Sequence, residues 1–214
     1  MLSAATSLRH LMVVGDIVDT WTPSTNVSLP SLRTLSIGIK ERGHYSSHDE
    51  PQFSGLLNTI TAPSLELLLM QSVDEYTFRK SPPPVAKFPR LQWLILERTC
   101  IPSDLVGTLS KAFDSVRHLV YDADNPLPLV DADTIWPQLR TLSLLVGFGN
   151  LETIEALSRK CAASAHPLEN IFVRDVPPAS VESQSILVEK FNWATAYARL
   201  PYDFQLLSQV KGLV

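Results

Sequence analysis

The chain has 214 residues, of which 45% are hydrophobic and 19% charged, and this composition excludes a disordered chain. Its 18 basic and 22 acidic residues give a net charge of −4, which argues against a nucleic-acid partner. No apolar run approaches the roughly 18 residues that a membrane-spanning helix needs. The N-terminal sequence also lacks the features of a signal peptide. We therefore expect a cytoplasmic or nuclear protein that binds neither nucleic acid nor membrane.

One segment type recurs along the chain. Its clear copies are LPSLRTLSIGI (29–39), APSLELLLMQS (62–72), FPRLQWLILER (88–98) and WPQLRTLSLLV (136–146), and its weaker copies begin at Ala5, Phe113 and His166. The shared core is L-x-x-L-x-L, and its first residue falls at Leu8, Leu32, Leu65, Leu91, Val116, Leu139 and Leu168. Successive copies are 24, 33, 26, 25, 23 and 29 residues apart. Most of these spacings lie in or near the period of leucine-rich repeats, about 20–29 residues.

The fourth and sixth positions of each copy are apolar throughout. They are Leu11/Val13, Leu35/Ile37, Leu68/Met70, Leu94/Leu96, Leu119/Tyr121, Leu142/Leu144 and Ile171/Val173. Because side chains alternate along a strand, these two positions point the same way. Short strands with one apolar face bury it by stacking in parallel around a shared core.

Proline marks where most copies begin. The prolines two residues before the first leucine are Pro30, Pro63, Pro89 and Pro137. Proline disfavours helix in the preceding residue and is tolerated at the start of a strand. The residues before these prolines are Leu29, Ala62, Phe88 and Trp136, and we expect them to fill the core at the corner.

Three of the connecting segments show helical periodicity. The predicted helices run over 53–60, 105–113 and 151–161, with Ser103 and Asn150 as N-caps of the last two. The links at 16–28 and 124–135 have no such pattern and are expected to be irregular. The sequence thus predicts an α/β fold: a leucine-rich-repeat solenoid of about seven irregular repeats, with a short-stranded parallel concave sheet and convex helices or loops.

These xPxLxxLxL segments resemble the leucine-rich-repeat regions of F-box-type proteins, especially the divergent ones of fungi. The resemblance covers about Ala5 to Val176, within a leucine-rich-repeat array predicted over residues 1–176. It implies substrate recognition in a ubiquitin-ligase (SCF-like) assembly. Two features depart from the pattern. The usual asparagine three residues after the third leucine is replaced in every copy, and no F-box-like helical segment precedes the first repeat.

Residues 177–214 break the repeat after Pro177 and Pro178. We expect a helical C-terminal cap, with helices over 180–200 and 203–211, that covers the exposed end of the core. A partner-binding amphipathic helix is the alternative. Repeat-like sequence begins almost at Met1, so a further hypothesis is that the chain is a fragment of a longer protein.

The sequence offers no catalytic motif, and we expect a protein that is not an enzyme and holds no cofactor or metal. His44 and His48 have a helical metal-ligand spacing, but the polar segment around them favours a solvated insertion loop. Cys100 and Cys161 match no metal or redox spacing and are expected to be buried or partly buried free thiols. A hydrolase with a loop-borne site is the alternative in the enzyme class.

The third, fifth and seventh positions of the copies are expected to face outward on the concave sheet. The apolar or aromatic residues at its centre are the predicted partner-binding residues: Leu67, Leu69, Trp93, Ile95, His118 and Val120. Exposed apolar patches and tryptophan are typical of protein interfaces. Two alternatives stay open for this patch. It either binds a partner, or it is covered by tails, helices or a part of the protein outside this chain.

Arginine recurs at the second position, at Arg9, Arg33, Arg117 and Arg140. The column is either a basic stripe for an acidic partner or a set of solvated charges. The function that these patterns favour is a non-catalytic protein–protein interaction module without a small-molecule substrate. A structural fragment of a larger repeat protein, with no independent function, is the alternative.

Overall fold

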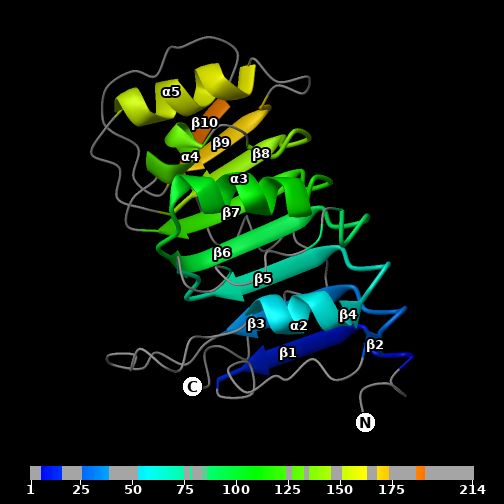
Figure 1. The fold of residues 1–214 in the computed structure, drawn as a ribbon. Coiled ribbons are helices and arrows are strands. Elements are labelled where there is room, and N and C mark those ends of the chain that lie inside the picture. The colour runs from blue at the N-terminus through cyan, green and yellow to red at the C-terminus, as the bar shows by residue number, and fades with distance from the viewer. Residues whose placement is uncertain are drawn as a thin grey trace, which may run out of the picture.

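The computed structural model describes residues 6–15, 26–38, 53–74, 78, 84, 86–123, 127–132, 135–145, 151–162, 168–173 and 187–190. Within them the chain forms a mixed α/β fold around one parallel sheet (Figure 1). The strands of this sheet, in spatial order, are β1 (His10–Val14), β3 (Thr34–Gly38), β5 (Leu67–Gln71), β6 (Trp93–Thr99), β7 (His118–Ala123), β8 (Thr141–Leu144), β9 (Asn170–Val173) and β10 (Leu187–Lys190). Spatial order follows chain order, so each strand lies between its neighbours in the sequence.

The register of the sheet pairs equivalent motif positions. Leu35 pairs with Leu68, which pairs with Leu94, and the same column continues through Leu119 and Leu142. All of these pairings are parallel. The prediction of one parallel strand per repeat is therefore confirmed for the seven copies of the motif.

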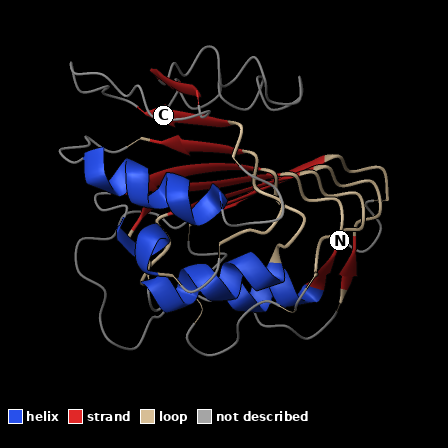
Figure 2. Ribbon diagram, turned by 90° about the horizontal axis from the view of Figure 1, so that it is seen from above, coloured by secondary structure: helices blue, strands red, loops and turns tan. Residues whose placement is uncertain are grey.

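The described helices lie on one side of the sheet (Figure 2). They are α2 (Phe53–Thr59), α3 (Ser103–Ala112), α4 (Leu127–Asp131) and α5 (Leu151–Ala162). We call this side the helix face and the opposite side the far face. Three of the helices were predicted. Ser103 is not the N-cap of α3, however, because Pro102 holds that position in extended backbone and no side chain caps the helix. Asn150 lies outside the described residues.

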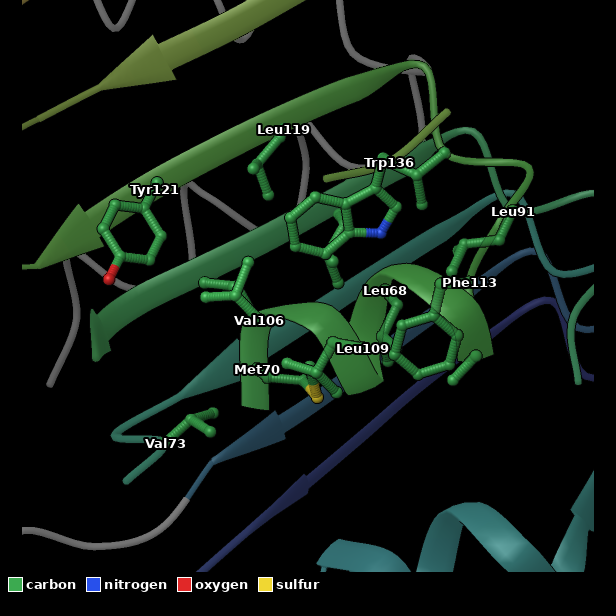
Figure 3. Close-up of a cluster of buried hydrophobic side chains, with 14 of the residues drawn as sticks. Leu68, Met70, Val73, Leu91, Val106, Leu109, Phe113, Leu119, Tyr121 and Trp136 are labelled. Atoms are coloured by element: carbon green, nitrogen blue, oxygen red, sulfur yellow. The ribbon is translucent and has the colours of Figure 1, made fainter. Parts of the chain in front are cut away.

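The core fills the space between the helix face and the helices. Val106 and Leu109 of α3 point toward the side chains of the strands, and Trp136 lies among them (Figure 3). Every motif residue at the fourth and sixth positions from β3 to β9 is buried. The four residues that precede the prolines are also buried: Leu29, Ala62, Phe88 and Trp136. Their predicted role as corner plugs is confirmed.

Backbone geometry compensates for the missing asparagines. Gly15, Ser72 and Arg98 occupy the same motif place and all three have positive φ. Gly15 and Ser72 directly follow β1 and β5, and Arg98 is the penultimate residue of β6. A residue in this left-handed conformation turns the chain away from the direction of the strand. At the place of the asparagine, Val73 and Thr99 are buried instead. The Val73 carbonyl accepts a hydrogen bond from the amide of Cys100 at 2.8 Å, which ties adjacent repeats together.

The links differ from expectation in two places. The link predicted to be irregular over 124–135 contains the short helix α4, whose Leu129 is buried in the core. The link over 16–28 ends in β2 (Val27–Ser28), which pairs in parallel with β4 (Ile60–Thr61) in a second, two-stranded sheet. Most of that link lies outside the described residues.

The predicted C-terminal helix over 180–200 is wrong at residues 187–190. These residues form strand β10, which pairs in parallel with β9. The helical spacing of Leu187 and Phe191 was misleading, because the open edge of β9 offers backbone partners to any extended segment. The rest of that helix, the helix predicted over 203–211 and the division at residue 177 lie outside the described residues.

Candidate partner-binding face

The far face carries three columns of side chains, one from each outward motif position. Parallel register places the members of a column on neighbouring strands. The fifth-position column runs along the middle of the face and consists of Met12, Ser36, Leu69, Ile95, Val120, Ser143 and Phe172. None of the helices in the described residues lies on this side. This is the face that the sequence predicts to bind a partner.

Four of the six predicted binding residues are buried. Leu67 is 0% exposed, Ile95 2%, Leu69 3% and Val120 4%. The sequence left open whether this patch is an exposed binding site or a covered one. Because these four side chains are buried, the structure supports the covered alternative for them. Strand alternation assigned them to the correct face, but the expectation that they are exposed is wrong.

The buried residues form a second apolar cluster, separate from the main core. Its members are Leu67, Leu69, Ile95, Val120, Leu145 and Phe172, with Trp93 packed against them. Leu145 and Phe172 were placed in the outward columns by the sequence but were not among the predicted site residues. Their membership of the outward columns could have predicted this contact, because a column continues across every strand that stays in register.

Trp93 and His118 remain half-buried at the centre of the far face. Their rings stack with centroids 4.1 Å apart and an interplanar angle of 19°. The two residues are direct partners in the pairing of β6 with β7. They present aromatic surface with a polar tip, a combination that is common at protein interfaces. Thr141 and Asn170 continue the column on β8 and β9, and both are also half-buried.

The seventh-position column is polar in the middle of the sheet. Gln71 Nε2 donates a hydrogen bond to Glu97 Oε2 at 2.8 Å, and both side chains are half-buried. Gly38 is their neighbour on β3, where a Cβ atom would lie 2.7 Å from Gln71 Oε1. A larger residue at position 38 would therefore push Gln71 aside. The buried middle column therefore has polar groups along one side, and the Trp93–His118 pair lies along its other side.

The first strand exposes apolar side chains on the far face. Met12 is 39% exposed and Val14 is 46% exposed, and they are the large hydrophobic residues that the structure leaves open within its described part. Both belong to the outward columns of β1. The far face is therefore open at the β1 edge and buried along its middle column from β3 onward.

Residues that could ligate a metal do not converge in the described part of the chain. No group of three or more His, Cys, Asp or Glu residues is placed to hold a metal among the described residues. His44 and His48 lie outside them. Cys100 and Cys161 are both thiols outside any disulfide, as predicted, but Cys100 is exposed and not buried or partly buried. Burial raises the pKa of the Cys161 thiol to about 12, while the adjacent Lys160 acts in the opposite direction.

Among the described residues, no helix is both long and apolar enough to cross a membrane. No protein-family model, curated protein or solved structure matches the chain.

Proposed function

We propose that this chain is a leucine-rich-repeat solenoid that acts as a non-catalytic protein-binding module. The support is the agreement between the repeat and the sheet. Each copy of the motif supplies one strand, and equivalent positions pair across seven strands. Stacked repeats of this kind present side chains in aligned columns over a broad surface, which suits recognition of another macromolecule.

The observation that carries the proposal is the stacked Trp93–His118 pair. Its two rings lie in the middle of the sheet, on the face without a described helix, and both are partly accessible. Tryptophan in such a position is a common anchor of protein interfaces, because it contributes a large apolar area at a low cost in side-chain entropy. We infer that a partner packs against this pair and reaches Thr141 and Asn170 along the same column.

The finer form of the proposal comes from the resemblance to F-box-type repeat proteins. It is substrate recognition in a ubiquitin-ligase (SCF-like) assembly, in which the repeats select the protein to be modified. A partner that is itself a ligase component, or that is degraded in a manner dependent on Trp93, would support this form. Binding without any change in the partner's lifetime would leave only the binding module.

The test is quantitative co-purification of partners with Trp93→Ala and His118→Ala variants. Lys111→Ala is the matched control, because Lys111 is exposed on α3 at the helix face. We expect each far-face variant to recover at least about tenfold less partner than the native chain, as is typical when a hot-spot side chain is truncated. Lys111→Ala should lose none. Thermal unfolding of each variant shows whether the fold is kept, and unchanged partner recovery with folded Trp93→Ala would refute the proposed site.

Burial of the second apolar cluster favours one other candidate. With Leu67, Leu69, Ile95 and Val120 at 4% exposure or less, the far face serves as a second core. The chain would then be a structural part of a larger repeat protein and would bind no partner of its own. In the same experiment this candidate predicts identical partner profiles for both far-face variants and the Lys111→Ala control.

A further inference from the structure

Three arginines converge on a small hollow at the edge of the sheet where the strands begin. Arg9, Arg33 and Arg90 line it together with Glu66, and its volume is about 200 Å³. Pockets that hold drug-sized ligands are larger, about 300–1,000 Å³, so this hollow suits a single small group. Three guanidinium groups and one carboxylate give the hollow a formal charge of +2, although the chain as a whole carries −4.

The repeat explains why these charges meet. Arg9, Arg33 and Glu66 occupy the second motif position of three successive copies. Backbone hydrogen bonds hold these three residues side by side. The Arg33 amide donates to the Arg9 carbonyl at 2.8 Å, and the Glu66 amide donates to the Arg33 carbonyl at 2.9 Å. Neighbouring strands are about 4.8 Å apart, so Arg9 and Arg33 hold like charges side by side. An anion between them would relieve that repulsion.

Within the part of the chain that the structure describes, these arginines are poorly neutralised. Arg33 Nε lies 4.0 Å from Glu66 Oε1, at the limit of an ion pair, and the Arg33 side chain is 52% exposed. Within the described residues, neither Arg9 nor Arg90 has a side-chain ion pair or hydrogen bond. Ser31 and Ser64 also line the hollow and add hydroxyl donors. The guanidinium fork matches the oxygen geometry of phosphate, and hydroxyls complete such sites.

We propose that this hollow binds one phosphate dianion, either free or carried as a monoester. A dianion fits better than a single carboxylate, because three guanidinium groups share the space. A nucleic-acid backbone fits worse, because the second-position column does not continue as a basic stripe. Beyond Arg33 it passes through Glu66 and Gln92 before it reaches Arg117, and its last arginine, Arg140, is paired with Glu169 at 3.1 Å. The proposal does not depend on a partner at the far face.

The test is titration of the whole chain at constant ionic strength, with the arginine side-chain N–H signals followed by NMR. The probes are inorganic phosphate and a short phosphoserine peptide, each compared with chloride and with the unphosphorylated peptide. We expect saturable binding of both phosphate probes, with shifts at Arg9, Arg33 and Arg90. Tighter binding of the phosphopeptide would identify a phosphorylated protein as the source, and equal binding would identify free phosphate.

Variants separate a built site from general positive charge. Arg9→Ala and Arg90→Ala should each weaken phosphate binding by about tenfold, because each loses charge-assisted hydrogen bonds. Glu66→Gln should tighten it, because a repelling carboxylate is removed. Arg117→Ala is the matched control, since Arg117 is exposed in the same motif column but does not line the hollow. Equal losses in Arg117→Ala and Arg9→Ala, or no saturable binding of either phosphate probe, would overturn the proposal.

Discussion

The two faces of the main sheet bury the same kinds of residue but in different settings. On the helix face, leucines pair with leucines across the central strands, and the described helices lie over this side of the sheet (Figure 2). On the far face, six buried apolar residues form a smaller cluster, and the fifth-position column that supplies four of them also contains the buried Ser36 and Ser143. Trp93 and His118 border that cluster and stay partly accessible. The comparison shows that strand alternation determines which face of the sheet a residue lies on. It does not determine whether that face is exposed to solvent.

Neighbouring leucines on β5 allow this comparison to be tested within one strand. Leu68 lies on the helix face and is 0% exposed, and the next residue, Leu69, lies on the far face and is 3% exposed. Leu68→Ala should lower the free energy of unfolding by about 3 kcal/mol, because it leaves a cavity in the main core. Denaturant unfolding measures the loss, and Leu68→Met is the volume-conserving control. A loss comparable to that of Leu68→Met would contradict the burial of this face.

Leu69→Ala tests the far face in the same way. We expect a loss of about 2 kcal/mol, smaller than for Leu68 because the cluster around Leu69 contains fewer apolar partners. Leu69→Met again controls for the change of side-chain type. If Leu69→Ala costs no more than an exposed surface substitution, within about 0.5 kcal/mol, the far face is open in solution and the comparison fails.

The sequence predicted the helix face well because its signal is redundant. Every copy repeats two apolar positions, and proline marks the corner, so errors in one copy are corrected by the others. Signals without repetition were less reliable: the helical stripe through Leu187 gave the wrong element, and the short helix α4 was missed. A segment of four or five residues carries too few turns for helical periodicity to be recognised.

The candidate site was only half predictable for a different reason. Alternation placed Leu67 and Ile95 on the far face correctly, but their burial depends on tertiary packing, which no local pattern encodes. The arginine hollow was likewise invisible. Arg9 and Arg33 stood out as a column, whereas Arg90 comes from a different motif position and joins them only in the folded chain.

Tyr121 extends the comparison to pH, because it lies at the sixth motif position on the helix face. Burial raises its pKa to about 12 from its ordinary value of 10.0, although a hydrogen bond with Thr99 acts in the opposite direction. The unfolded chain loses this proton first, so stability is retained below pH 10 and falls as the pH rises from 10 toward 12. The loss attributable to this group reaches roughly 1 kcal/mol at pH 11 and roughly 2 kcal/mol at pH 12, because one pKa unit corresponds to about 1.4 kcal/mol.

Unfolding of the native chain and of Tyr121→Phe at several alkaline pH values measures that contribution. The phenylalanine variant should lose less stability across this pH range, because it has no phenol to ionise. An equal alkaline loss in both proteins would mean that Tyr121 is accessible to water in the folded state.

The two cysteines give the smallest expected difference, in reactivity and not in stability. Cys100 is exposed, whereas Cys161 is buried and its pKa is raised to about 12. A thiol reagent should therefore modify Cys100 in the folded chain and reach Cys161 only after denaturation. Stoichiometric counting of released chromophore, with Cys100→Ser as control, checks this. Rapid modification of Cys161 in the folded control would show that the packing around α5 is loose.

The most direct test of the far face as a binding surface is site-specific photo-crosslinking in cells. A photoreactive residue is placed at His118 on the far face and, in a second protein, at Lys111 on the helix side. The proposed function predicts a discrete cross-linked partner from position 118 that is absent from position 111 and is lost when Trp93→Ala is added. Identical cross-linking from both positions, or the same product with Trp93→Ala, would contradict it.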